Sequence, residues 1–359
     1  MTAPSRSTRC GARSWRVRSS LAPTKHLDRI VAWYFHTVYA RLEGPGVLPF
    51  YCDPDRIGAF AVERSDLAAG NPDTLFRLFV TLAMYQARRD RLIMAQQKAM
   101  DPPEAALLSS PAVLAEAVTS SPCDLLRGSP EAFDQGCDVR LVDCTLTCGR
   151  YPGAPCPVKT AARLLRRMAD LGKLPVSAWM RLAKDQALDR ELAVVLAEER
   201  EPTRRAERLV RHLTSVYRVG TKLATLFVSV LSTPALAPGL TPWYPGVNGY
   251  ELLVLDTNVA KVVDALRGPT ARATPAERTR WLRTQAARID PSLHGEELPA
   301  HSPRMVQQAL YWFGSSSNRT AHGEPCATLG TRPCSECAPV ACPFPARASS
   351  PPRKLPSLR

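Results

Sequence analysis

The sequence predicts an all-α protein, and three kinds of pattern indicate this. Apolar residues recur at i, i+3 and i+4 between Arg204 and Val216, which places one face of a helix on a core. A polar N-cap residue followed by proline opens helices at Asn71-Pro72, Thr274-Pro275 and Ser302-Pro303. The stretch from Leu75 to about Gln86 is apolar nearly all round, which is typical of a buried central helix.

Length, charge and cysteine content narrow the class of protein. A chain of 359 residues can bury a sizeable core and hold two or three domains. Lys and Arg number 47 against 33 Asp and Glu, a net charge of +14 that favours a polyanionic partner, nucleic acid before a membrane surface. A coding bias towards Arg, Ala and Pro is the other explanation for part of this excess. No apolar run approaches the ~18 residues that span a bilayer, so we expect a soluble protein.

The first two segments are a basic arm and a helix. Residues 1–26 carry no acid, and we expect a disordered arm that binds phosphate non-specifically; an organelle transit peptide is the alternative. The next helix ends at Gly44-Pro45-Gly46. Its apolar stripe consists of Leu27, Ile30, Val31, Tyr34, Val38 and Leu42.

A cysteine group follows two short helices that prolines delimit. Eleven cysteines, clustered late in the chain, indicate reduced thiols and metal rather than disulfides. The spacing C-x6-C-x3-C-x7-C could close around zinc or a second iron–sulfur cluster, or the thiols could be scattered. The residues of this possible second metal site are Cys137, Cys144, Cys148 and Cys156, with Cys123 nearby.

The middle and end of the chain continue as helices. We expect them over 158–171, 177–184 and 188–200, whereas the prolines and glycines of 232–251 exclude an element interior. In that loop Trp243 and Tyr244 either pin the chain or stack on a base, and pinning is favoured. From Pro345 the tail is rich in Pro, Ser and Arg, and we expect it to be disordered.

A tight turn joins two helices at Tyr217-Arg218-Val219-Gly220, and the second helix opens at Thr221. We expect Gly220 to occupy a place where a Cβ would obstruct. The N–H groups that open the second helix can hold a phosphate oxygen without any side chain. Lys222 lies in the first turn of that helix, where its amine is a candidate nucleophile.

Four stretches together resemble the helix-hairpin-helix DNA glycosylase superfamily, in the branch typified by endonuclease III. They are the hairpin at 204–231, FRLFVTLAMYQARRD from Phe76, LDTNVAKV from Leu255, and a cysteine group. That last group consists of Cys326, Cys334, Cys337 and Cys342. The resemblance implies a two-lobed fold in which 72–255 form the helical lobe, with the cysteine-bearing insertion at 123–156. Residues 27–71 and 256–344 would form the other lobe, with an iron–sulfur loop at 326–342 and DNA bound between the lobes.

The resemblance also implies a function. It indicates a base excision repair enzyme on double-stranded DNA, a DNA glycosylase with abasic-site lyase activity. Lys222 would attack the sugar C1′, and Asp256 would stabilise the positive charge that develops or help to move the lysine proton. Gln86 would fill the space left by the extruded base, as a member of the DNA-binding set Gln86, Arg88, Arg218, Val219, Gly220 and Thr221. The terminal cysteines would hold a [4Fe–4S] cluster of structural role, with zinc as the alternative.

The sequence departs from the family pattern in ways that keep other functions open. Arg218 stands where the hairpin usually has its first glycine, Asn258 stands where a histidine often follows the aspartate, and the terminal cysteine spacing is x7, x2, x4. The alternatives are a catalytically inactive DNA-binding protein, a two-cluster iron–sulfur redox protein, or a glycosylase without lyase activity. We expect a monomer in the nucleoid-containing cytoplasm or the nucleus. The damaged base is not predicted.

Overall fold

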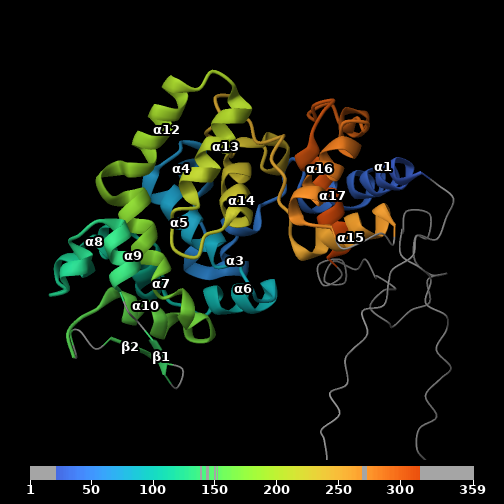
Figure 1. Cartoon of the computed structure of the whole chain (residues 1–359). Coiled ribbons are helices and arrows are strands. Elements are labelled where there is room, and N and C mark those ends of the chain that lie inside the picture. Colours follow the sequence, from blue (N-terminus) through green and yellow to red (C-terminus); the bar gives the residue numbers. More distant parts are fainter. Residues whose placement is uncertain are drawn as a thin grey trace, which may run out of the picture. The chain divides into compact units, whose positions relative to one another are not determined.

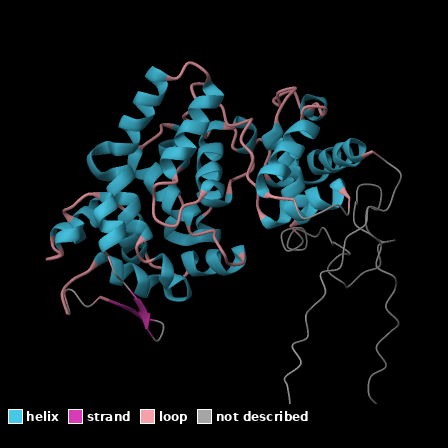
Figure 2. Cartoon of the chain, in the orientation of Figure 1, coloured by secondary structure: helices cyan, strands magenta, loops and turns pink. Residues whose placement is uncertain are grey.

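The computed structural model of the chain describes residues 22–137, 140–142, 145–148, 151, 153–268 and 273–315. It divides into a larger unit, residues 38–254 with 302–305, and a smaller unit. The described residues of the smaller unit are 22–37, 255–268, 273–301 and 306–315. Helices make up the regular structure of both, apart from one two-stranded hairpin among the described residues (Figure 2). The prediction of an all-α protein is therefore confirmed.

The larger unit is built from short helices, and several of them begin at proline. Its first part contains α2 (Ala40–Leu42), η2 (Phe50–Cys52), α3 (Pro54–Ile57), η3 (Gly58–Phe60), α4 (Arg64–Ala68), α5 (Pro72–Ala83), α6 (Asp90–Lys98), α7 (Pro102–Ser109), α8 (Pro111–Thr119), η4 (Asp124–Leu126) and α9 (Pro130–Gly136). The strands β1 (Arg140–Val142) and β2 (Thr145–Thr147) then pair antiparallel. After them come α10 (Pro157–Leu165), η5 (Arg166–Leu171), α11 (Leu174–Ala178), η6 (Trp179–Ala183), η7 (Lys184–Gln186), α12 (Ala187–Glu198), α13 (Pro202–Leu213), α14 (Thr221–Ser232) and η8 (Pro234–Leu236).

Helix α5 lies at the centre of this unit, as its apolar sequence predicts (Figure 1). The Asn71 side chain caps it by accepting hydrogen bonds from the N–H groups of Asp73 and Thr74, at 3.0 and 3.1 Å. Its Phe79 ring meets the Phe227 ring of α14 edge-on, with centroids 5.1 Å apart. Apolar side chains on nearly every face of α5 are removed from water, and this burial makes the helix the core of the larger unit.

The smaller unit contains α1 (Pro23–Trp33), α15 (Thr257–Arg267), α16 (Pro275–Ala286), η9 (Pro291–His294) and most of α17 (Pro303–Gly314). The π-helix η1 (Tyr34–Tyr39) continues α1 and contains the boundary between the units. At the predicted N-cap Thr274, this residue and Glu277 form a capping box at the start of α16, with N–H···O distances of 3.2 and 2.7 Å. Arg278 donates two hydrogen bonds to the Asp264 carboxylate, at 2.8 and 2.7 Å, which ties α16 to α15.

Two predicted boundaries need correction. Helix α1 begins at Pro23, so the last residues of the predicted arm are helical; residues 1–21 lie outside the described part. Residues 38–71, predicted to pack with the C-terminal lobe, belong to the larger unit because Ile57, Phe60 and Leu67 join its core. The insertion at 123–156 contains η4, α9 and the β-hairpin. The predicted iron–sulfur loop and the tail from 345 lie outside the described residues.

The 232–251 segment forms no element longer than a single 3₁₀ turn, as its prolines and glycines predict. Trp243 is buried, with its backbone N–H donating to the Leu231 carbonyl at 3.1 Å and the centroid of its ring 5.7 Å from that of Phe227, so it pins the loop. Tyr244 is 43% exposed. Among the described helices, none has the length and apolar character needed to cross a bilayer.

Candidate functional site

The hairpin is present in the larger unit as α13, a turn over 214–220, and α14. The predicted buried face of α13 is confirmed, because Ala206, Leu209 and Leu213 are fully buried. Helices α13 and α14 pack against each other, and this packing fixes the turn at one end of the pair. The hairpin runs from Pro202 to Ser232, slightly longer than the predicted 204–231.

The backbone of the turn differs from the prediction at Gly220. Its φ is −91°, a value open to any residue, and a Cβ added there would meet nothing within 4 Å. The expectation that a Cβ would obstruct the turn is therefore wrong. The left-handed position is Arg218, with φ +62°, which is where the family pattern has its first glycine. Because Gly220 has no side chain and no other atoms lie close to it, the surface beside its Cα is open.

The start of α14 offers backbone donors to that space. Within the described residues, the N–H groups of Gly220, Thr221 and Lys222 donate to no backbone or side-chain acceptor, and all three residues are exposed. The N–H of Val219 donates to the Val216 carbonyl at 3.0 Å, and the Val219 side chain is buried. Of the residues predicted to contact phosphate, Val219 thus uses its N–H to stabilise the turn. The N–H groups that follow it have no acceptor there and are available to bind a phosphate.

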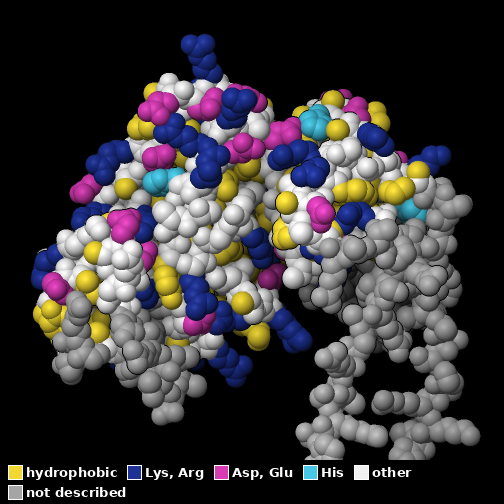
Figure 3. Space-filling view, in the orientation of Figure 1, with side chains coloured by type: hydrophobic (Ala, Val, Ile, Leu, Met, Phe, Trp, Pro, Cys, Tyr) yellow, Lys and Arg dark blue, Asp and Glu magenta, His cyan; other side chains and the backbone are white. Residues whose placement is uncertain are grey.

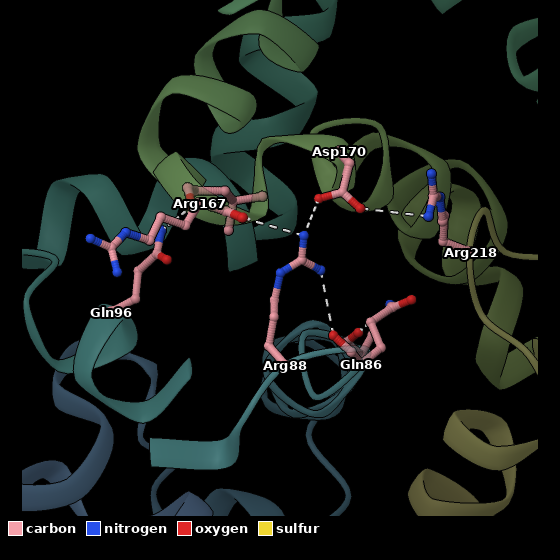
Figure 4. A network of polar contacts seen from close by, with 8 residues as sticks. Gln86, Arg88, Gln96, Arg167, Asp170 and Arg218 are labelled. Atoms are coloured by element: carbon pink, nitrogen blue, oxygen red, sulfur yellow. Dashed lines mark hydrogen bonds and ion pairs between the residues drawn. The ribbon is translucent and has the colours of Figure 1, made fainter. Parts of the chain in front are cut away.

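Asp170 connects two of the predicted DNA-contacting arginines (Figure 4). Its carboxylate forms an ion pair with Arg88, which follows α5, and a second with Arg218 of the turn, at 3.5 Å. Arg88 also donates to the carbonyls of Arg167, at 3.3 Å, and Gln86, at 3.4 Å. Asp170 comes from η5, a segment that carries no motif pointing to a functional residue. The structure therefore gathers Gln86, Arg88 and Arg218 around an acid that sequence reasoning missed.

Gln86 does not lie on a helix. Helix α5 ends at Ala83, and Gln86 folds back so that its Nε2 donates to the Ala83 carbonyl at 2.6 Å. The next residue, Ala87, has a φ of +57°, which a continuing helix cannot accommodate. The helix thus ends three residues before Gln86, and the prediction of a helix reaching Gln86 is wrong. To act as a wedge in DNA, this side chain would first have to give up its hydrogen bond.

Helix α11 and the residue before it hold the turn from the other side. The N–H of Tyr217 donates to Ser177 Oγ at 3.0 Å, and the Lys173 ammonium lies 4.7 Å from the centre of the Tyr217 ring. Lys173 also donates to the carbonyls of Asp134, at 2.8 Å, and Cys137, at 3.2 Å. This buried lysine thus joins the hairpin turn to the cysteine-bearing segment.

The two predicted catalytic residues lie in different units. Lys222, in the first turn of α14, is exposed and makes no ion pair within the described part of the larger unit. Asp256 is the N-cap of α15 in the smaller unit, where its carboxylate accepts from the Val259 N–H at 2.8 Å. Asn258 Nδ2 donates to the same carboxylate at 3.5 Å. The carboxylate thus satisfies a backbone donor of the first turn of α15.

The second cysteine group surrounds a cavity of about 350 Å³ in the larger unit. Cys137, Cys148 and Cys156 line it as the sequence suggested, but their companion is Cys123; Cys144 lies outside the described residues. All four lining thiols are free. Burial raises the pKa of Cys137 to about 12; the Lys173 ammonium opposes this rise, and the three other thiols add to it.

Both signs of charge occur on the face drawn in Figure 3, where Lys and Arg side chains of the larger unit are interspersed with Asp and Glu. A single basic patch does not cover that face, so a DNA contact would depend on particular groups. Comparisons with protein-family models, curated proteins and solved structures found no match to the chain. The likeness to the glycosylase superfamily therefore rests on the motifs themselves.

Proposed function

We propose that the chain is a DNA glycosylase with abasic-site lyase activity that acts on damaged duplex DNA in base excision repair. The observation that carries this proposal is the open start of α14. Three backbone N–H groups without an acceptor in the described part of the chain stand beside an exposed lysine, and the adjacent Gly220 has no Cβ to block an approaching phosphate. Backbone donors and the positive helix end suit a phosphate oxygen of the DNA strand.

In the proposed reaction Lys222 is the nucleophile. Its amine, after losing a proton, forms a bond to C1′ while the glycosidic bond breaks and the base leaves with the bonding electrons. Opening of the sugar ring gives a Schiff base, which lets a C2′ proton depart and the 3′ phosphate leave. Asp256 would stabilise the positive charge on the sugar or accept the lysine proton. Extruding the base costs a few kcal/mol, which the backbone contacts of the hairpin would offset.

The proposed DNA contacts follow the donors that the turn makes available. The N–H groups of Gly220 and Thr221 would bind a phosphate. Arg218 and Arg88 would give up their ion pairs with Asp170 and form ion pairs with DNA phosphates instead. Gln86 would enter the space of the extruded base. The terminal cysteines Cys326, Cys334, Cys337 and Cys342 are proposed to hold a [4Fe–4S] cluster, with zinc as the alternative.

Borohydride trapping on duplex DNA with an abasic site tests this proposal. Reduction of the Schiff base would join protein and DNA covalently, and Lys222→Gln would abolish the adduct. Lys98→Gln, which changes an exposed lysine at the end of α6, is the matched control and would trap normally. An adduct of unchanged yield in Lys222→Gln would remove the assigned nucleophile.

A duplex-binding protein without any adduct or product would favour the inactive DNA-binding alternative, which the Arg218 turn keeps open. Base release without trapping would indicate a glycosylase that lacks lyase activity. A panel of duplexes containing oxidised pyrimidine, uracil, mismatched adenine or an abasic site would identify the substrate.

A further inference from the structure

Four cysteines reach one cavity of the larger unit from the ends of four different segments. Cys123 is the N-cap of η4, Cys137 is the C-cap of α9, Cys148 follows β2, and Cys156 is the N-cap of α10. Their separation along the chain hides this arrangement in the sequence. Each cysteine lies at or next to the end of a helix or strand. All four can therefore line the same cavity while the helices and the β-hairpin pack around it.

The four cysteines are not placed to share a single metal ion. In the described residues, no group of three or more His, Cys, Asp or Glu side chains is placed to hold one metal ion. A tetrahedral zinc site has Zn–S bonds of about 2.3 Å, so its sulfurs lie within about 4 Å of one another. The four thiols here instead border a cavity of about 350 Å³, which suits a polynuclear group that four cysteines hold from its corners.

The surroundings of the cavity suit an anionic, sulfur-ligated group. Leu126, Phe133 and Val158 line it with apolar side chains that are buried in the core. Lys159 also lines it, and the Lys173 ammonium donates to the Cys137 carbonyl at 3.2 Å. The positive charge of these lysines would offset part of the negative charge that a cluster held by four thiolates brings into the site.

We propose that Cys123, Cys137, Cys148 and Cys156 hold a [4Fe–4S] cluster of structural role in the larger unit. This cluster is additional to the one expected at the terminal cysteines and does not depend on repair activity. It would join η4, α9, the β-hairpin and α10 at one point. Through Cys137, Lys173 and Tyr217 it would also support the hairpin turn.

The decisive protein is the full chain with Cys326, Cys334, Cys337 and Cys342 all changed to Ala, which removes the other candidate site without touching the described residues. Under anaerobic reducing conditions it is given a preformed [4Fe–4S] cluster carrying four small-molecule thiolates. Each protein thiol then passes its proton to the thiolate that it displaces, and no net oxidation or reduction occurs. After desalting, we expect about four iron and four sulfide per chain.

Adding Cys123→Ala and Cys156→Ala to this protein removes the bound iron and sulfide. Cys52→Ala is the matched control, since Cys52 is a buried free cysteine of the same unit that does not line the cavity, and it retains them. Far-ultraviolet circular dichroism checks that each variant is folded. Should the four-alanine protein itself take up no iron, or carry one zinc per chain instead, the proposal is overturned whether or not the cavity variants fold.

Discussion

The Arg218 guanidinium lies 3.5 Å from the Asp170 carboxylate, and Arg218 itself has the left-handed backbone that the hairpin turn requires. The same carboxylate pairs with Arg88. Asp170 therefore neutralises two cations near the proposed phosphate site while it fixes the turn against η5. Any phosphate that binds these arginines must compete with it.

Replacing Asp170 with Asn tests this competition. The pairs are partly exposed, so we expect the free energy of unfolding to fall by at most about 1 kcal/mol. Freed guanidiniums should tighten non-specific duplex binding and steepen the dependence of log K on log salt by about one unit for each further phosphate that they neutralise. Fluorescence anisotropy across a salt series measures both. Asp66→Asn, at an exposed acid of α4, removes the same charge and should leave the slope unchanged.

The left-handed backbone of Arg218 predicts a difference between two substitutions. Arg218→Gly and Arg218→Ala both lose the pair with Asp170, so that loss cancels in the comparison. Only glycine adopts a φ of +62° without strain, and we expect the alanine variant to be less stable by about 1 kcal/mol. Urea denaturation gives the difference; equal stability would mean that the turn relaxes to another conformation.

Gly220→Ala separates folding from DNA binding. Its φ of −91° and the open space around it predict a change in stability of less than about 1 kcal/mol. The added methyl would project towards an approaching phosphate, so duplex affinity should fall. Gly249→Ala provides the contrast: its Cβ would overlap the hydroxyls of Thr233 and Ser232, and we expect a loss of about 2 kcal/mol or more. Unchanged DNA affinity in Gly220→Ala would argue against the phosphate site.

Lys173→Met removes the link between the cysteine cavity and the turn. Two backbone carbonyls would lose a charged donor in a buried place, and the Tyr217 ring would lose its cation. We expect the free energy of unfolding to fall by about 2 kcal/mol. Hydrogen exchange at the Val219 amide, which bonds within the turn, should become faster. Lys98→Met at an exposed position should alter neither measurement.

His294 predicts a dependence of the smaller unit's stability on pH. Burial lowers its pKa, the neighbouring His36 lowers it further, and Asp28 and Asp290 oppose this. A folded pKa below 6.5 means that the native state binds fewer protons than the unfolded state in this range. The stability contribution is complete above pH 6.5 and is lost as the pH falls towards the folded value. His294→Phe keeps a ring stacked on Phe35 and should weaken this loss in thermal melts between about pH 7 and 5. An identical pH profile in the variant would place the titration elsewhere.

Local sequence patterns specify the helices and their beginnings. Asn71, Asp256 and Thr274 cap helices because each side chain bonds to backbone N–H groups two or three residues ahead, an interaction that needs no tertiary structure. The apolar faces of α5 and α13 likewise follow from helical spacing alone. The all-α class was predictable for the same reason.

Which side chains meet depends instead on how the helices pack. Arg88 and Asp170 are 82 residues apart, and no local pattern pairs them. Cys123 joins the cavity thiols because packing of the larger unit brings the starts of η4 and α10 to one cavity, and spacing along the chain could not show this. Contacts between distant residues form when whole helices bury their apolar faces against one another. A helix can bury its face only when the helices that cover it are also folded, so its own sequence does not specify these contacts.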